Sequence, residues 1–140
     1  MDETVLWESI RTQQNKSQAG LSAGRYLTQG VTIKSDAYQY EFKLGWQNGK
    51  QQVLEPISLD YKKGGDIVDK ANTWAGRLLE LSRKSEFEMT AVITSPTPRS
   101  NLRDHNRAKQ LLSRAPQVRM VVESEEIETV WRTILRDVRD

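Results

Sequence analysis

Apolar and polar side chains alternate along residues 38–46, and this period of two indicates a β-strand. The apolar members of this strand are Tyr38, Tyr40, Phe42, Leu44 and Trp46. The dipeptide Asn48-Gly49 follows, which readily adopts the positive φ angles of a two-residue type I′ turn, and residues 53–61 form a second β-rich run. We therefore predict a β-hairpin in which Gln47 pairs with Lys50.

After the hairpin, apolar side chains recur every three or four residues, which is typical of amphipathic helices. The predicted helices cover residues 66–81, 102–115 and 124–138, with Asp66 and Ser124 as N-caps. Two short runs between them, residues 89–94 and 118–122, are continuous and rich in β-branched side chains, as buried strands are.

This order predicts an α/β fold: a mixed sheet with an N-terminal antiparallel β-hairpin followed by αβαβα, with helices flanking the sheet. We expect residues 1–140 to form one domain. Residues 1–34 contain few large apolar groups after Ile10, so we expect a loosely organised N-terminal helix and loop, as in a fragment of a longer protein.

Composition narrows the chemistry that the chain could perform. The 140 residues include no Cys and one His, which excludes thiol catalysis, thiolate metal sites and paired-histidine mechanisms. The 21 basic and 19 acidic side chains nearly balance. No apolar run approaches a membrane span, so we expect a cytoplasmic protein without a membrane partner.

The first candidate site is Asp60-Tyr61-Lys62, at the end of the predicted second hairpin strand. An acid and a lysine two positions apart on a strand project to one face, where the acid can bind Mg²⁺ or Mn²⁺ and the lysine can help activate water. A helix, a hairpin ending in (D/E)-x-K, a further helix and a buried strand together resemble the PD-(D/E)xK, or restriction-endonuclease-like, superfamily. The resemblance implies a metal-dependent nuclease, with Asp60 and Lys62 as catalytic residues and Asp60 as a metal ligand.

In that superfamily a second acid shares the metal, and Glu41 is the nominee for both catalysis and metal binding. The predicted pairing leaves Glu41 about 13 Å short of Asp60. Asp36 points to the opposite face unless a bulge rotates it, and Glu8 on the first helix is another alternative. The proline-aspartate step of the superfamily does not occur in the chain. We therefore expect no cofactor, or Mg²⁺ or Mn²⁺ if the site is catalytic.

The second candidate site is basic and lies on the helix predicted at residues 102–115. Four arginines, at spacings of four, four and seven residues, can form one helix face suited to phosphates: Arg99, Arg103, Arg107 and Arg114. The alternative is that these arginines pair with nearby acids such as Glu123. The loop at residues 94–101 is a third place where an anion could bind, or a connection stiffened by its two prolines. We expect His105 to be solvated and Trp46 to be partly exposed.

Three functions follow from these features. The first is a non-catalytic accessory or interaction domain with a nuclease-like fold that contacts nucleic acid or a protein partner. The alternative is a Mg²⁺-dependent phosphodiesterase that uses Asp60 and Lys62. The third is an oligomerisation domain, in which the edge of the tyrosine-rich hairpin pairs with another copy to form a homodimer.

Overall fold

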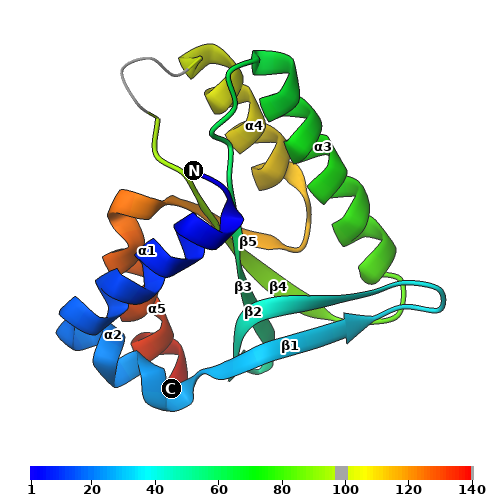
Figure 1. The fold of residues 1–140 in the computed structure, drawn as a ribbon. Coiled ribbons are helices and arrows are strands. Elements are labelled where there is room, and N and C mark those ends of the chain that lie inside the picture. Colours follow the sequence, from blue (N-terminus) through cyan, green and yellow to red (C-terminus); the bar gives the residue numbers. More distant parts are fainter. Residues whose placement is uncertain (97–100, 140) are drawn as a thin grey trace.

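The computed structural model describes residues 1–96 and 101–139 and confirms the predicted α/β class. One mixed sheet has the strand order β1-β2-β3-β4-β5 (Figure 1). The strands are β1 (Thr28–Lys34), β2 (Gln39–Asn48), β3 (Lys50–Ile57), β4 (Phe87–Ile93) and β5 (Val118–Glu123). Strands β1, β2 and β3 pair antiparallel, whereas β3, β4 and β5 pair parallel.

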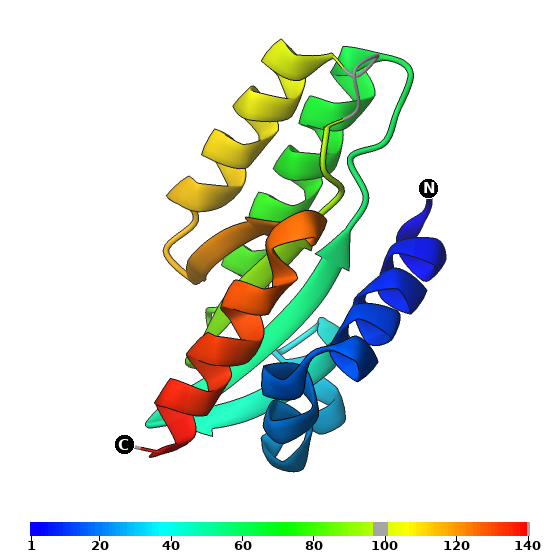
Figure 2. The ribbon, with the colours of Figure 1, turned by 90° about the vertical axis from the view of Figure 1, so that its left-hand side faces the viewer.

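Helices cover both faces of this sheet, as Figure 2 shows. They are α1 (Glu3–Lys16), α2 (Gln18–Ala23), α3 (Gly64–Leu81), α4 (Leu102–Arg114) and α5 (Ile127–Arg139), with short 3-10 turns η1 (Gly24–Tyr26) and η2 (Ser124–Glu126). The apolar core is therefore divided in two: α3 and α4 pack on one face of the sheet, and α1, α2 and α5 pack on the other. Among the described residues, no helix combines the length and the apolar character that crossing a membrane requires.

The N-terminal segment is more ordered than the sequence predicts, because residues 3–34 form α1, α2 and β1 rather than one helix and a loop. Small residues allow the first two helices to pack closely: a Cβ on Gly20 would lie 2.7 Å from the carbonyl oxygen of Gln14. The Ser17 hydroxyl caps α2 by accepting the Gly20 N–H and donates to Glu128 of α5. A segment with the amino-acid composition of a loop thus forms two closely packed helices, α1 and α2.

The predicted hairpin exists, but its register is wrong by one residue. Asn48 pairs with Lys50, and Gly49 alone makes the bend with a φ of 70°. Gln47 therefore pairs with Gln51 rather than with Lys50. A single glycine at positive φ takes the place of the two-residue turn.

A buried carboxylate marks the point where β2 separates from β3. Pairing between these strands ends at Leu44 and Leu54. The next residue of β3, Glu55, is 3% exposed and accepts the backbone N–H of Lys43 at 3.1 Å and the hydroxyl of Tyr40. Burial raises the pKa of Glu55 to about 7, and the bonds from Tyr40 and Lys43 oppose this rise. Beyond this point β2 pairs with β1 only, and the β1–β2 ribbon extends past the end of α3 (Figure 1).

The tryptophans show where the core prediction succeeded and where it failed. Trp74 and Trp131 are core residues, 3% and 0% exposed. Trp46, which we expected to be partly exposed, is only 2% exposed. Its indole Nε1 donates to Asp137 of α5 at 3.0 Å, so the final helix covers the end of the hairpin.

Candidate nucleic-acid interface

In the structure, Asp60 and Lys62 do not lie in the sheet. Strand β3 ends at Ile57, not at residue 61, so both residues lie in the connection that leads to α3. Side-chain acceptors replace the strand ladder here: Ser58 N–H donates to Glu3 at 3.2 Å, and Leu59 N–H donates to Thr94 at 3.0 Å. The two-residue spacing therefore no longer puts Asp60 and Lys62 on one face of a strand.

Asp60 borders a hollow of about 320 Å³ at the carboxyl ends of β4 and β5. Its carboxylate lies 2.8 Å from the amino nitrogen of Met1. The other lining residues are Thr94, Ser95, Pro96, Ser124 and Glu125. The second acid in this hollow is therefore Glu125, which was not among the acids nominated from the sequence.

Glu41 is not brought to Asp60. It is exposed on β2, pairs across the sheet with Thr32 of β1 and lies against Gly30. Asp36 is at the tip of the β1–β2 ribbon, where its carboxylate is 3.7 Å from the Lys84 ammonium. Within residues 1–96 and 101–139, no group of three or more His, Asp or Glu side chains could hold a metal ion.

The first helix does supply an acid to the end of β3, but it is Glu3 rather than Glu8. Glu3 accepts the Ser58 N–H and forms an ion pair with Lys70 of α3 at 2.5 Å. Burial raises the pKa of Glu3, but the bonds from Lys70 and the backbone outweigh it, so the pKa is lowered overall. Glu3 therefore serves to tie α1 to β3 and α3.

The arginines of α4 form one outward stripe. Arg103, Arg107 and Arg114 are exposed, and at about 100° per residue they fall within about 40° of one another around the helix axis. No ion pair joins any of the three to an acid in the described part of the chain. Arg99, the fourth predicted member, lies outside the described residues. The predicted basic face therefore exists over the length of the helix.

Glu123, the acid that we expected to pair with these arginines, instead contacts Lys109 and His105. Glu123 of β5 accepts a bond from Lys109 at 3.0 Å and lies 3.7 Å from Nε2 of His105. His105, which we expected to be solvated, is 2% exposed because it faces the sheet from the first turn of α4. Burial lowers the pKa of His105, and the nearby Glu123 only partly opposes this. A neutral His105 adds no charge to the arginine stripe.

The start of α3 adjoins the start of α4 and extends the basic surface. A Cβ on Gly64 would lie 1.7 Å from a carboxylate oxygen of Asp104, so only glycine allows this approach. The Asp104 carboxylate thus lies against the start of α3. Lys62 and Lys63, both exposed, immediately precede Gly64. The lysine that the sequence nominated for catalysis thus lies two residues before the glycine that meets α4.

A hollow of about 590 Å³ runs along this part of α4. All of its lining residues carry polar or charged side chains, one of them an acid: Asn101, Arg103, Asp104, Asn106, Arg107 and Gln110. Guanidinium groups and side-chain amides are the donors that most often contact phosphate oxygens in nucleic-acid complexes. This part of the surface is therefore suited to a polyanion.

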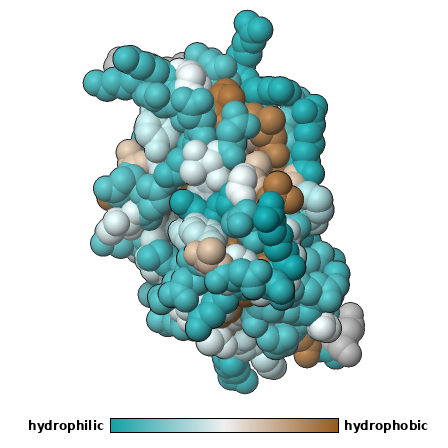
Figure 3. All heavy atoms as spheres, turned by 90° about the vertical axis from the view of Figure 1, so that its right-hand side faces the viewer, coloured by the Kyte–Doolittle hydropathy of each residue, from teal (hydrophilic) through white to brown (hydrophobic). Residues whose placement is uncertain are grey.

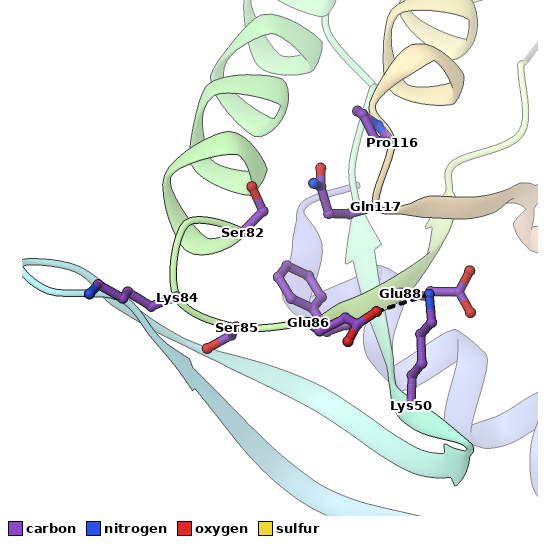
Figure 4. A pocket seen from close by; sticks show the side chains of 9 residues that line it. Lys50, Ser82, Lys84, Ser85, Glu86, Glu88, Pro116 and Gln117 are labelled. Atoms are coloured by element: carbon purple, nitrogen blue, oxygen red, sulfur yellow. Dashed lines mark ion pairs between the residues drawn. The ribbon is translucent and has the colours of Figure 1, made fainter.

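A third hollow, of about 430 Å³, lies at the opposite end of the sheet, before β4 and after α3 and α4 (Figure 4). Its rim carries both signs of charge: Lys50 is 3.4 Å from Glu86, and Lys84 and Glu88 also line it. Phe87, which contributes an apolar wall, is 4% exposed. This balance of charge gives no preference for an anion.

The surface that carries α3 and the tip of the β1–β2 ribbon is mostly hydrophilic, with apolar atoms in separate small patches (Figure 3). Such a surface does not resemble the continuous apolar patch of a hydrophobic docking site.

Comparisons of the chain with protein-family models, with curated proteins and with solved structures found no match. The residues of the site are therefore the basis for any assignment of function.

Proposed function

We propose that the chain is a non-catalytic accessory domain that binds nucleic acid through the outward face of α4. The observation that carries this proposal is the stripe formed by Arg103, Arg107 and Arg114, which is exposed and forms no ion pair with an acid among the described residues. Lys62 and Lys63 add two cations at one end.

The dimensions of the stripe suit a phosphate backbone. Arg103 and Arg107 are about 6 Å apart along the helix, and Arg114 is about 10 Å further, at a rise of about 1.5 Å per residue. Successive base pairs rise by about 3.4 Å, so the stripe spans about five of them. Contacts of this kind position a protein on nucleic acid without reading its sequence, as expected of an accessory domain.

We also propose that the chain is a catalytically degenerate relative of the PD-(D/E)xK superfamily. Support comes from the order of elements: helix, hairpin, helix and buried parallel strand occur as α1, β2–β3, α3 and β4. The (D/E)-x-K positions themselves have left the strand. The alternative, a Mg²⁺-dependent phosphodiesterase, is supported by Asp60 and Glu125 in one hollow.

Binding of a fluorescent 20-nucleotide DNA or RNA, single- or double-stranded, tests the main proposal. The charge-removing pair Arg103→Ala/Arg107→Ala should weaken binding at least tenfold. The matched control is Arg25→Ala/Arg83→Ala, which removes the same charge from exposed positions outside α4. Equal losses in both variants would refute a specific role for α4.

Thermal melting at increasing concentrations of Mg²⁺ or Mn²⁺ distinguishes the phosphodiesterase hypothesis from the non-catalytic binding domain. A metal that binds the folded chain should raise the melting temperature, with a stabilisation that grows as the logarithm of metal concentration over Kd, and Asp60→Asn should abolish the response. Metal-dependent nicking of DNA that disappears in Lys62→Ala would replace the binding proposal with the enzymatic one.

A further inference from the structure

Strand β5 ends the sheet on the side of its parallel strands. In the described part of the chain it pairs only with β4, so no strand pairs with its outer side. Three of its six residues, Val118, Met120 and Val121, are half-buried apolar side chains. An unpaired apolar edge is a ready template for another strand.

The other edge of the sheet, β1, has features that prevent such pairing. It exposes Thr28, Gln29, Thr32 and Lys34. Gly30, at a φ of 70°, falls at a gap in its pairing with β2. Polar side chains, a terminal lysine and an irregular backbone protect an edge from association.

Strand β5 contains neither Gly nor Pro, although its register with β4 shifts once, where Arg119 is passed over between Val118 and Met120. Its two charged side chains both bind other elements of the same chain. Arg119 forms a two-pronged ion pair with Asp137 of α5, and Glu123 pairs with Lys109 of α4. Arg119 and Glu123 therefore do not present free charges that would oppose pairing of β5 with another strand.

Charge is distributed so that two copies of β5 are complementary when antiparallel. Glu125 and Glu126 follow its carboxyl end, and Arg114 precedes its amino end. A two-fold axis between Met120 and Val121 would bring the acidic end of each copy to the basic end of the other. Closed two-fold symmetry requires this antiparallel arrangement.

We propose that β5 pairs antiparallel with β5 of a second copy of the chain, so that one sheet runs through a homodimer. From the sequence we placed the pairing edge on the tyrosine-rich hairpin, where β2 has neighbours on both sides at Gly45 but pairs with β1 alone between Gln39 and Phe42. The proposal does not depend on nucleic-acid binding. The dimer places both α4 stripes on the same face of the joined sheet.

Analytical ultracentrifugation over a wide range of protein concentrations tests this proposal. The expected result is a reversible change from the 16.1 kDa chain to twice that mass. Met120→Lys, which places a charge on the edge, should raise the dissociation constant at least tenfold. Val31→Lys is the matched control, since Val31 is a half-buried apolar residue on the opposite edge strand.

A second pair of variants decides the question if Met120→Lys does not fold. Glu125→Arg/Glu126→Arg alters only exposed side chains and should weaken the dimer, and adding Arg114→Glu should restore it. A chain that stays monomeric at every concentration would overturn the proposal. A dimer disrupted by Val31→Lys but not by the β5 variants would also overturn it.

Discussion

Replacing Glu55 with Gln should abolish a specific pH dependence of stability. Glu55 is buried where β2 leaves β3, and its carboxylate accepts from Lys43 N–H and from the Tyr40 hydroxyl. A glutamine keeps the shape: its carbonyl oxygen can accept the Lys43 N–H, and its amide group can donate to the Tyr40 oxygen. The variant therefore removes the titration while retaining the contacts.

The size of the effect follows from the pKa of Glu55, which burial raises from 4.5 to about 7 in the folded chain. Because the folded state holds the proton more tightly, Glu55 reduces the free energy of unfolding as pH rises from 4.5 to 7, and not outside that window. The full difference corresponds to about 3 kcal/mol. Wild type should therefore lose up to this amount relative to Glu55→Gln between pH 4.5 and 8.

Urea unfolding at half-unit pH steps, followed by tryptophan fluorescence, measures this difference. Subtracting the two stability curves cancels the contributions of all other titrating groups. Glu41→Gln, the same change at an exposed position of β2, controls for the loss of one negative charge. A difference curve that stays flat within about 0.5 kcal/mol, or that resembles the one for Glu41→Gln, would refute this account of the β2–β3 separation.

Further predictions concern the buried histidine and two glycines. Burial lowers the pKa of His105, so the folded chain loses stability as pH falls below 6.5, and His105→Gln should reduce that loss in the same unfolding assay. Gly76→Ala should raise the free energy of unfolding by about 1 kcal/mol, because the new methyl group meets no atom within 4 Å in the interior of α3. Gly45→Ala should lower the free energy of unfolding by about 1–3 kcal/mol, since its Cβ would lie 2.5 Å from Val31 and 3.0 Å from the backbone oxygen of Gln52. A Gly45→Ala chain more stable than the Gly76→Ala chain would contradict the packing described.

The elements that the sequence predicted well are those with a strong period. Helices α3, α4 and α5 carry apolar stripes, and the runs that became β4 and β5 are short and rich in β-branched residues. Strand β1 was missed because Val31 and Ile33 are its only large apolar residues, and pairing with β2 provides most of its order. Local pattern cannot show a strand whose stability comes from its neighbour.

The register of the hairpin shows a similar limit. Asn48-Gly49 favours a two-residue turn, but the strands bend at Gly49 alone, and Glu55 ends the pairing five residues after Lys50. The choice depends on side chains that meet only in the folded sheet. The end of β3 at Ile57, which removes Asp60 from the strand, likewise depends on contacts with Glu3 and Thr94.

For the candidate site, the spacing of the arginines on α4 was sufficient to predict a common face, since helix geometry is local. The approach of the segment after Lys62 to α4 was not predictable, because it requires α3 and α4 to pack side by side at Gly64 and Asp104. The burial of His105 has the same origin: the helix turns that side of its first turn to the sheet.

The salt dependence of nucleic-acid binding is the most direct measurement of the central claim. The logarithm of the association constant should fall linearly with the logarithm of salt concentration, with a slope of about −0.9 for each phosphate neutralised on duplex DNA. We predict a slope of about −3 to −5 for wild type, about two less steep for Arg103→Ala/Arg107→Ala, and no change for Arg25→Ala/Arg83→Ala. No measurable binding at low salt, or an unchanged slope in the α4 variant, would contradict the assignment of this face to phosphate contact.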